Sequence, residues 1–279
     1  MKNSRQLKDL IRNMAREKGI NAQILMRNYM LERLLERIAL SEFKDKFVLK
    51  GGMLVAAVVG IDLRSTIDMD ATIKSYPLSV ESVQDIFTSI LSVPVNDGVT
   101  IELKSAKAIR DEAEYTGVRV ALEACLGNTR ASLKVDITAG DAITPKEMVY
   151  RFDLLLEDRS IDILAYNIET VIAEKIETLL SRGTANSRMR DYYDLYILLQ
   201  LRGQAIDVRT LTDAVTATAQ RRGSSALLSE GTLILEEIFT NEDLSRLWKE
   251  YQKEYNYAED ISWEEVKKSV LYLWDMINL

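Results

Sequence analysis

The 279-residue sequence contains no histidine, and this absence is the most restrictive feature of its composition. Without histidine, Ser-His-Asp and Cys-His relays and His-ligated zinc are ruled out or strongly disfavoured. Any chemistry must therefore use carboxylates, lysine, arginine, tyrosine or a bound metal ion. Such a set of side chains suits Mg²⁺, which prefers hard oxygen ligands.

Cysteine and long apolar runs are also scarce. Cys125 is the only cysteine, which excludes an intramolecular disulfide and fits the reducing cytosol, so we expect a cytoplasmic protein. The apolar neighbours of Cys125 predict a buried thiol. No stretch approaches the roughly 20 consecutive apolar residues of a membrane span, and the basic N-terminal segment lacks the apolar core of a secretory signal. We therefore expect no membrane partner.

The net charge of −7 argues against a protein that coats nucleic acid in general, because neutralising phosphates requires clustered lysine and arginine. It is compatible with a local basic face, with acidic residues around a metal site, or with a basic partner.

Hydrophobic periodicity predicts an α+β first half and a helical second half. Residues 1–47 have a helical pattern, and an apolar helix follows Gly51-Gly52 over residues 53–59. The period changes to two over 66–73, which predicts a strand, and a helix is expected over 78–92. Further strands are expected near 99–103, 116–125, 131–138 and 149–156. From about 168 the pattern is helical, with breaks at Gly183, Gly203 and Gly223.

Two carboxylates in the predicted strand 66–73 are the main candidates for a functional site. Strand side chains alternate between faces, so Asp68 and Asp70 should point the same way, roughly 7 Å apart at the backbone. Carboxylates on one face repel each other unless a cation lies between them. The alternative is that both occupy the solvent face of an ordinary strand.

Two other segments favour the metal interpretation. Gly51-Gly52 precedes a helix, where backbone N–H groups can bind phosphate. Asp136 lies at the centre of a second apolar strand, and if this strand pairs beside the first, three carboxylates converge. Such a cluster would be sufficient for two metal ions acting on a phosphoryl group.

The helical half contains a lysine inside an apolar stripe and a group of arginines. Lys175 follows Val171 and Ile172 by three or four residues on the predicted helix, so its ammonium group must either reach solvent or meet an anion. Asp191 begins the next helix, where a first-turn acid is common. Arg182, Arg188 and Arg190 flank the intervening loop, either as surface charge or for phosphate recognition.

The order Gly51-Gly52, Asp68-x-Asp70, Asp136 resembles the polymerase-β-type nucleotidyltransferase superfamily. The change of pattern along the sequence places a boundary near residue 160, so we expect domains over 1–160 and 161–279. The resemblance implies that this α+β protein is bilobed, with a nucleotidyltransferase core of mixed sheet and helices and an α-helical domain that completes the active site. It also implies that Asp68 and Asp70 bind Mg²⁺ and that Asp136 is a third metal ligand that helps to activate the attacking hydroxyl. Gly52 departs from the family pattern, where serine is common, and the interval to Asp68 is longer than in many members.

A longer series of motifs resembles the AbiEii family of toxins, which includes the MenT proteins. The motifs are K-G-G at 50–52, R-S-T-x-D-x-D at 64–70, K-V-D at 134–136, A-E-K at 173–175 and R-D-Y-Y-D-L at 190–195. The resemblance places catalytic roles on Asp68, Asp70, Asp136, Lys175 and Asp191. It places nucleotide binding on Gly52, Thr66 and Lys175, and Gly51 and Arg64, which lie within the same motifs, are further nucleotide-binding candidates. The clustering of Arg182, Arg188 and Arg190 at a helix start makes these arginines candidates for RNA phosphate contacts.

The same resemblance implies partners and a biological setting. It predicts transfer of a nucleoside monophosphate from an NTP, with GTP and CTP as the candidates, to an RNA acceptor such as the 3′ end of tRNA. It further predicts a monomeric toxin of an abortive-infection system against phage, with a cognate antitoxin such as a winged-helix repressor. Transfer to a small molecule or a protein remains an alternative, as does a GTP-binding toxin that acts without catalysis, since fold alone does not select the acceptor.

Overall fold

The computed structural model describes residues 4–110 and 116–277. The chain divides into two compact units, which are described separately below. The first, here called the sheet unit, comprises Met1–Gly140 and Met148–Ala165. The second, here called the helical unit, comprises Asp141–Glu147 and Tyr166–Leu279.

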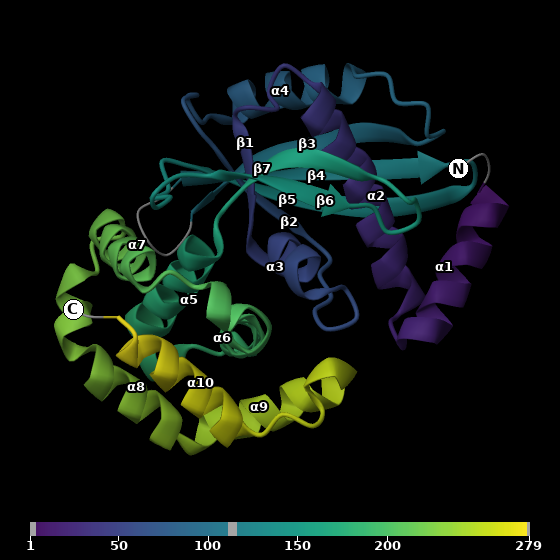
Figure 1. Ribbon diagram of the computed structural model, residues 1–279. Helices are drawn as coiled ribbons and strands as arrows, with labels where there is room; N and C mark the ends of the chain where they lie inside the picture. Colours follow the sequence, from purple (N-terminus) through teal and green to yellow (C-terminus); the bar gives the residue numbers. More distant parts are fainter. Residues whose placement is uncertain (1–3, 111–115, 278–279) are drawn as a thin grey trace. The chain divides into compact units, whose positions relative to one another are not determined.

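In the described residues, the sheet unit has a seven-stranded mixed sheet with the order β3-β4-β5-β2-β1-β7-β6 (Figure 1). Strand β2 pairs parallel with β5 and antiparallel with β1, which itself pairs parallel with β7. The remaining neighbours are antiparallel. The strands are β1 (Phe47–Lys50), β2 (Met69–Ile73), β3 (Thr100–Arg110), β4 (Thr116–Leu126), β5 (Thr129–Ala139), β6 (Met148–Asp153) and β7 (Ser160–Ala165).

The two faces of the sheet differ in polarity. On one face the alternate side chains of β2, β4 and β5 are apolar and buried, and they include Met69, Ala71, Val120, Val135 and Ile137. The helices α2 (Ala22–Leu40) and α4 (Val80–Ser92) contact this sheet and each other, and α1 (Ser4–Lys18) packs on α2. The opposite face of the same strands carries polar side chains, because residues alternate along each strand. This polar face contains the candidate carboxylates.

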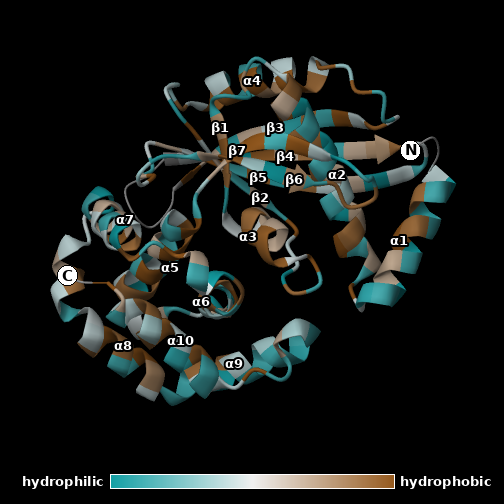
Figure 2. Cartoon of the chain, in the orientation of Figure 1, coloured by the Kyte–Doolittle hydropathy of each residue, from teal (hydrophilic) through white to brown (hydrophobic). Residues whose placement is uncertain are grey.

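Helix α3 (Gly51–Val59) follows β1 directly and is mainly hydrophobic (Figure 2). It contacts β1 and β2, with Met53, Leu54 and Val55 buried. The helix ends at Gly60, whose φ of 104° is readily adopted only by glycine. The buried apolar side chains of α3 hold its first turn against β2.

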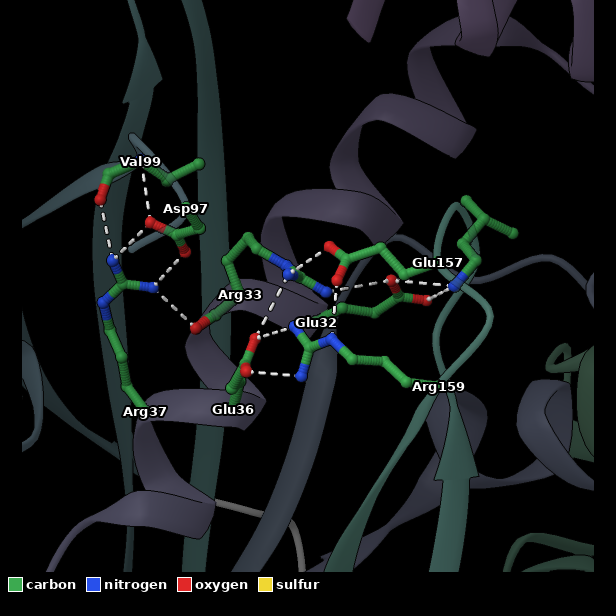
Figure 3. Close-up of polar contacts among 9 residues, drawn as sticks. Glu32, Arg33, Glu36, Arg37, Asp97, Val99, Glu157 and Arg159 are labelled. Atoms are coloured by element: carbon green, nitrogen blue, oxygen red, sulfur yellow. Dashed lines mark hydrogen bonds and ion pairs between the residues drawn. The ribbon is translucent and has the colours of Figure 1, made fainter. Parts of the chain in front are cut away.

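Helix α2 carries a buried network of ion pairs that connects it to two loops of the sheet unit. Arg37 forms two hydrogen bonds with the carboxylate of Asp97, at 2.8 and 3.1 Å. The neighbouring residue, Glu36, accepts two hydrogen bonds from Arg159, which lies in the β6–β7 turn. The network consists of Glu32, Arg33, Glu36, Arg37, Asp97, Glu157 and Arg159, with the carbonyl group of Val99 (Figure 3).

The helical unit contains, in its described part, the helices α5 (Ile168–Arg182), α6 (Met189–Arg202), α7 (Val208–Arg221), α8 (Gly231–Thr240), α9 (Glu242–Glu254) and α10 (Trp263–Asp275). Helix α5 begins where Asn167 accepts a hydrogen bond from the N–H of Thr170, a side-chain cap. Aromatic side chains from α6, α9 and the following segments pack together, with Tyr193 and Trp248 buried. None of the helices in the described residues is long and apolar enough to cross a membrane.

The α+β fold and the change to helices at residue 168 are confirmed, as are the helix breaks at Gly183, Gly203 and Gly223. Four expectations were wrong in detail. The strand expected over 66–73 begins at Met69, so Asp68 precedes it. The helical pattern over 1–47 ends at Leu40, and β1 and β7 had no counterpart among the expected strands. Cys125 is partly exposed, because β4 directs its neighbours Ala124 and Leu126 to the buried face.

Candidate active site

Asp70 lies near the middle of the sheet, between strands that each place a charged residue opposite it. The register pairs Asp70 with Lys50 of β1 on one side and with Asp136 of β5 on the other. Directly paired residues share a face of the sheet. The predicted convergence of Asp70 and Asp136 on one face is therefore present in the register.

The glycine turn at the start of α3 allows Asp70 to approach the backbone. Gly51 has a φ of 64°, and a Cβ atom at this position would lie 2.3 Å from Oδ2 of Asp70. The N–H of Gly52 donates a hydrogen bond to the Asp70 carboxylate. A side chain at residue 51 would displace Asp70, so the turn has a packing requirement in addition to any role in binding phosphate.

The surroundings of Asp70 disfavour its charged form. Burial raises the pKa of Asp70, and the nearby carboxylates of Asp136 and Asp68 raise it further. Lys50 and the Gly52 hydrogen bond act in the opposite direction, but the net shift is upward. A cation bound beside Asp70 would relieve this excess of negative charge.

The two neighbouring carboxylates are each held by a basic side chain. Asp68 lies 2.6 Å from Nζ of Lys134, and Asp136 accepts hydrogen bonds from Nε and Nη2 of Arg119, both at 2.8 Å. Within the described residues, no group of three or more Asp, Glu, Cys or His side chains is arranged to hold a metal ion. Of the three predicted ligands, Asp70 and Asp136 are thus in register, and Asp68 and Asp136 are directed toward basic partners.

The segment before β2 is buried and brings two predicted nucleotide-binding side chains to the glycine turn. Arg64 and Thr66 are only 3% and 5% exposed. A Cβ atom on Gly52 would lie 3.0 Å from Oγ1 of Thr66 and 3.2 Å from Nη2 of Arg64. Asn28 of α2 donates a 2.7 Å hydrogen bond to the carbonyl of Thr66, which fixes this segment to the core.

In the helical unit, Lys175 meets anions inside the protein. Its ammonium group lies 2.9 Å from Oδ1 of Asp191 and 2.6 Å from Oδ2 of Asp194. The Asp194 side chain is fully buried and the Asp191 side chain is 17% exposed. Of the two alternatives that the sequence left open, solvent or an anion, the structure shows anions, and they are two carboxylates of α6.

The three arginines of the α5–α6 loop lie in different environments. Arg182 ends α5 and is partly exposed, and Arg188 is the exposed residue immediately before α6. Arg190 is partly exposed, donates a hydrogen bond to the hydroxyl of Tyr255, and lies over its ring with the Cζ atom 4.9 Å from the ring centre.

Sequence reasoning assigned no role to four residues that lie beside the candidates, Lys50, Arg119, Lys134 and Asp194, although all but Arg119 lie within the motifs quoted above. Asp194 is three residues after Asp191 and therefore lies on the same helix face, a spacing that would have indicated it. Lys134 and Asp136 lie two residues apart on β5, so alternation places them on one face. Arg119 could be found only once the register of β4 and β5 was known.

The residues of the sheet unit fit a divalent metal ion. The oxygen ligands of Asp68 and Asp70 are of the type that Mg²⁺ prefers, and burial, with the neighbouring carboxylates, raises the pKa of Asp70 and so disfavours its charged form without a cation. Lys134 and Arg119 currently supply the opposite charge to Asp68 and Asp136.

Comparisons with known proteins identify the fold and the family of the chain. Two solved structures share the fold: JHP933 from Helicobacter pylori (16% identity, 92% of each chain covered, TM-score 0.52) and MenT4, a nucleotidyltransferase toxin from Mycobacterium tuberculosis H37Rv (14% identity, 95% of this chain and 98% of that chain covered, TM-score 0.56). No curated protein sequence matches the chain. The family model for the nucleotidyl transferase AbiEii toxin of type IV toxin–antitoxin systems matches residues 33–269. Because this match spans most of the sequence, the chain belongs to the AbiEii family of nucleotidyltransferase toxins.

Proposed function

We propose that this toxin transfers a nucleoside monophosphate from an NTP to the 3′-hydroxyl of an RNA, such as the acceptor end of tRNA, with Mg²⁺ as the metal ion. The observation that carries the proposal is the placement of the Asp70 carboxylate against Gly51 and Gly52, in register with Asp136. This arrangement combines carboxylate ligands with the N-terminus of a helix, two features that favour binding of a metal–nucleotide complex.

The reaction forms a bond between the acceptor oxygen and the α-phosphorus, and pyrophosphate leaves. Bound Mg²⁺ would supply Lewis-acid stabilisation of the phosphoryl oxygens. Asp68 and Asp70 hold the metal in this proposal, with Asp136 as the third ligand. The glycine turn and the side chains of Arg64 and Thr66 bind the triphosphate.

Two further roles are proposed for residues of the helical unit. Lys175 binds a phosphate oxygen, and Asp191 orients the acceptor hydroxyl or accepts its proton, a role in which Asp136 is the alternative. Asp191 suits such work because its side chain is partly exposed and within hydrogen-bond distance of a fixed cation. Arg182, Arg188 and Arg190 are proposed to contact RNA phosphates, which arginine recognises well.

Family membership implies a cognate antitoxin. We further propose that it is a winged-helix repressor and that the pair acts in abortive phage infection. The nucleotide is proposed to be GTP or CTP.

The acceptor and the nucleotide are tested by incubating the full chain with tRNA, Mg²⁺ and each α-labelled NTP in turn. We expect one NTP to give a labelled, extended tRNA that is lost in Asp68→Asn. Asp85→Asn is the matched control, since Asp85 is an exposed residue of α4. Label found on protein or on small molecules instead would favour the alternative acceptors, which the net charge of −7 also permits. A toxin that stays lethal in cells as stably folded Asp68→Asn would contradict catalysis itself.

A further inference from the structure

A row of charged residues crosses five strands on the polar face of the sheet. The register joins Lys50 of β1 to Asp70, Asp70 to Asp136, Asp136 to Arg119 of β4, and Arg119 to Lys107 of β3. Opposite charges in direct register stabilise a sheet, whereas the like charges of Asp70 and Asp136 oppose each other. The row therefore places the two carboxylates together between basic residues.

The contact between Arg119 and Asp136 is the most specific in this row. Both carboxylate oxygens of Asp136 accept a hydrogen bond from the guanidinium group at 2.8 Å, the paired geometry that makes such contacts strong. Asp136 is 19% exposed and Arg119 is 46% exposed, so the pair lies at the border of protein and solvent. Arg119 can leave this position by rotation of its side chain, whereas Asp136 is fixed within the sheet.

The guanidinium group lies in the field of all three candidate carboxylates. Hydrogen bonding to Asp136 raises the pKa of Arg119, and Asp68 and Asp70 add to the increase. Lys134, two residues before Asp136 on β5, contacts one carboxylate oxygen of Asp68 at 2.6 Å. Basic side chains thus provide the positive charge that a bound metal ion would provide.

We propose that Arg119 is a positioning residue that holds Asp136 away from the metal site. A divalent ion must displace Arg119 before Asp136 can become its ligand. The inference rests on the proposed metal site. A carboxylate whose two oxygens face a guanidinium group must exchange this partner before it can ligate a metal, and two cations close to one carboxylate repel each other. Arg119 therefore lowers the affinity of the site for the metal, and Asp136 becomes the third ligand only after Arg119 is displaced.

The test measures metal binding directly, without nucleotide or turnover. Mn²⁺ is titrated into the full chain, and the free ion is followed by electron paramagnetic resonance. We expect Arg119→Gln to bind Mn²⁺ about tenfold more tightly than the wild type, because the substitution removes a cation that competes for both oxygens of Asp136. Arg119→Lys keeps the charge but loses the paired hydrogen bonds, so its affinity should lie between the two.

The matched control is Lys107→Gln, which makes the same change of charge on the same row one strand further away. We expect its affinity to stay within about twofold of the wild type, because charges on an exposed surface are screened over this distance. The gain in Arg119→Gln should also disappear in an Asp136→Asn background. A gain in affinity that persists in the Asp136→Asn background, or that Lys107→Gln reproduces, would overturn the proposal. Such a gain would reflect only the loss of a positive charge near the site.

Asp70→Asn separates this proposal from the one on which it depends. Mn²⁺ binding that Asp70→Asn does not weaken would contradict the metal site, and with it this role of Arg119. Binding that requires Asp70 but is unchanged in Arg119→Gln would overturn the role of Arg119 alone. Thermal melting of each variant shows whether it is folded, and the exposure of Arg119 predicts that it is.

Discussion

Lys175 lies 2.6 Å from a carboxylate oxygen of Asp194, a side chain with no exposed surface. Its second partner, Asp191, is 2.9 Å away and partly exposed. The lysine that the family pattern assigns to the nucleotide is therefore also the counter-ion of a buried acid. A loss of activity on its replacement has two possible origins, and stability measurements separate them.

Lys175→Ala should lower the free energy of unfolding strongly, by about 3–5 kcal/mol, because it removes one partner of a buried ion pair. Asp191→Asn should lower it by no more than about 1 kcal/mol, since its side chain is partly exposed. Urea denaturation of both variants measures the difference. Equal stability of Lys175→Ala and the wild type would show that the pair has no structural role. Because Asp191→Asn should change stability less than Lys175→Ala, a loss of activity in Asp191→Asn is easier to assign to catalysis.

Gly51→Ala should abolish nucleotidyl transfer, while Gly19→Ala should leave it intact. Both glycines have a positive φ, 64° and 66°, so each alanine should cost about 1–2 kcal/mol of stability. Only at Gly51 would the added Cβ lie 2.3 Å from Asp70, whereas nothing lies within 4 Å of it at Gly19. Thermal melting measures the backbone cost that both variants share, and transfer assays show the additional effect of displacing the Asp70 carboxylate. Full activity in Gly51→Ala would show that Asp70 can move without consequence.

The sequence predicted the candidate carboxylates but not the basic residues that hold them. Asp68 and Asp70 follow from strand alternation, which is a local property, and the helix stripe around Lys175 is equally local. The pairing of Arg119 with Asp136 depends on the register of β4 and β5, which no local pattern specifies. The strand β1 was missed because all four of its residues are buried, so it shows no alternation of polar and apolar side chains.

The position of Asp68 illustrates a different limit. The alternation of residues 66–73 suggested one continuous strand, but Thr66 donates its hydroxyl to the carbonyl of Asp68, at 3.2 Å. Such a local hydrogen bond competes with the ladder of a sheet. The strand consequently begins one residue after Asp68, and the paired carboxylates of the motif occupy different local structures.

Glu32→Gln should make the stability of the protein less dependent on pH. Burial raises the pKa of Glu32 to about 8, although it accepts hydrogen bonds from the N–H of Leu155 (Figure 3). The unfolded chain releases this proton near pH 4.5, so wild-type stability should fall as the pH rises from about 4.5 to about 8. The loss should be on the order of a few kcal/mol. Glutamine stays neutral and removes this contribution.

Melting temperatures at pH 6 and pH 8.5 test the effect of Glu32. We expect the wild type to lose more stability between these values than Glu32→Gln does. Glu17→Gln, on the exposed face of α1, is the control and should follow the wild type. Parallel curves for all three proteins would mean that Glu32 is ionised in the folded state at neutral pH.

The arginines before and within α6 should separate RNA binding from stability. Arg188 is exposed, so Arg188→Ala should weaken tRNA binding and reduce the slope of log affinity against log salt by about 1, with little change in melting temperature. Arg190 lies over Tyr255 and bonds its hydroxyl, so Arg190→Ala should lower the melting temperature as well. Fluorescence anisotropy with labelled tRNA at several KCl concentrations measures both slopes. If neither slope changes, these arginines do not contact the RNA backbone, and the acceptor is bound elsewhere. A lowered slope in Arg188→Ala alone would instead assign the phosphate contact to the exposed arginine and a packing role to Arg190.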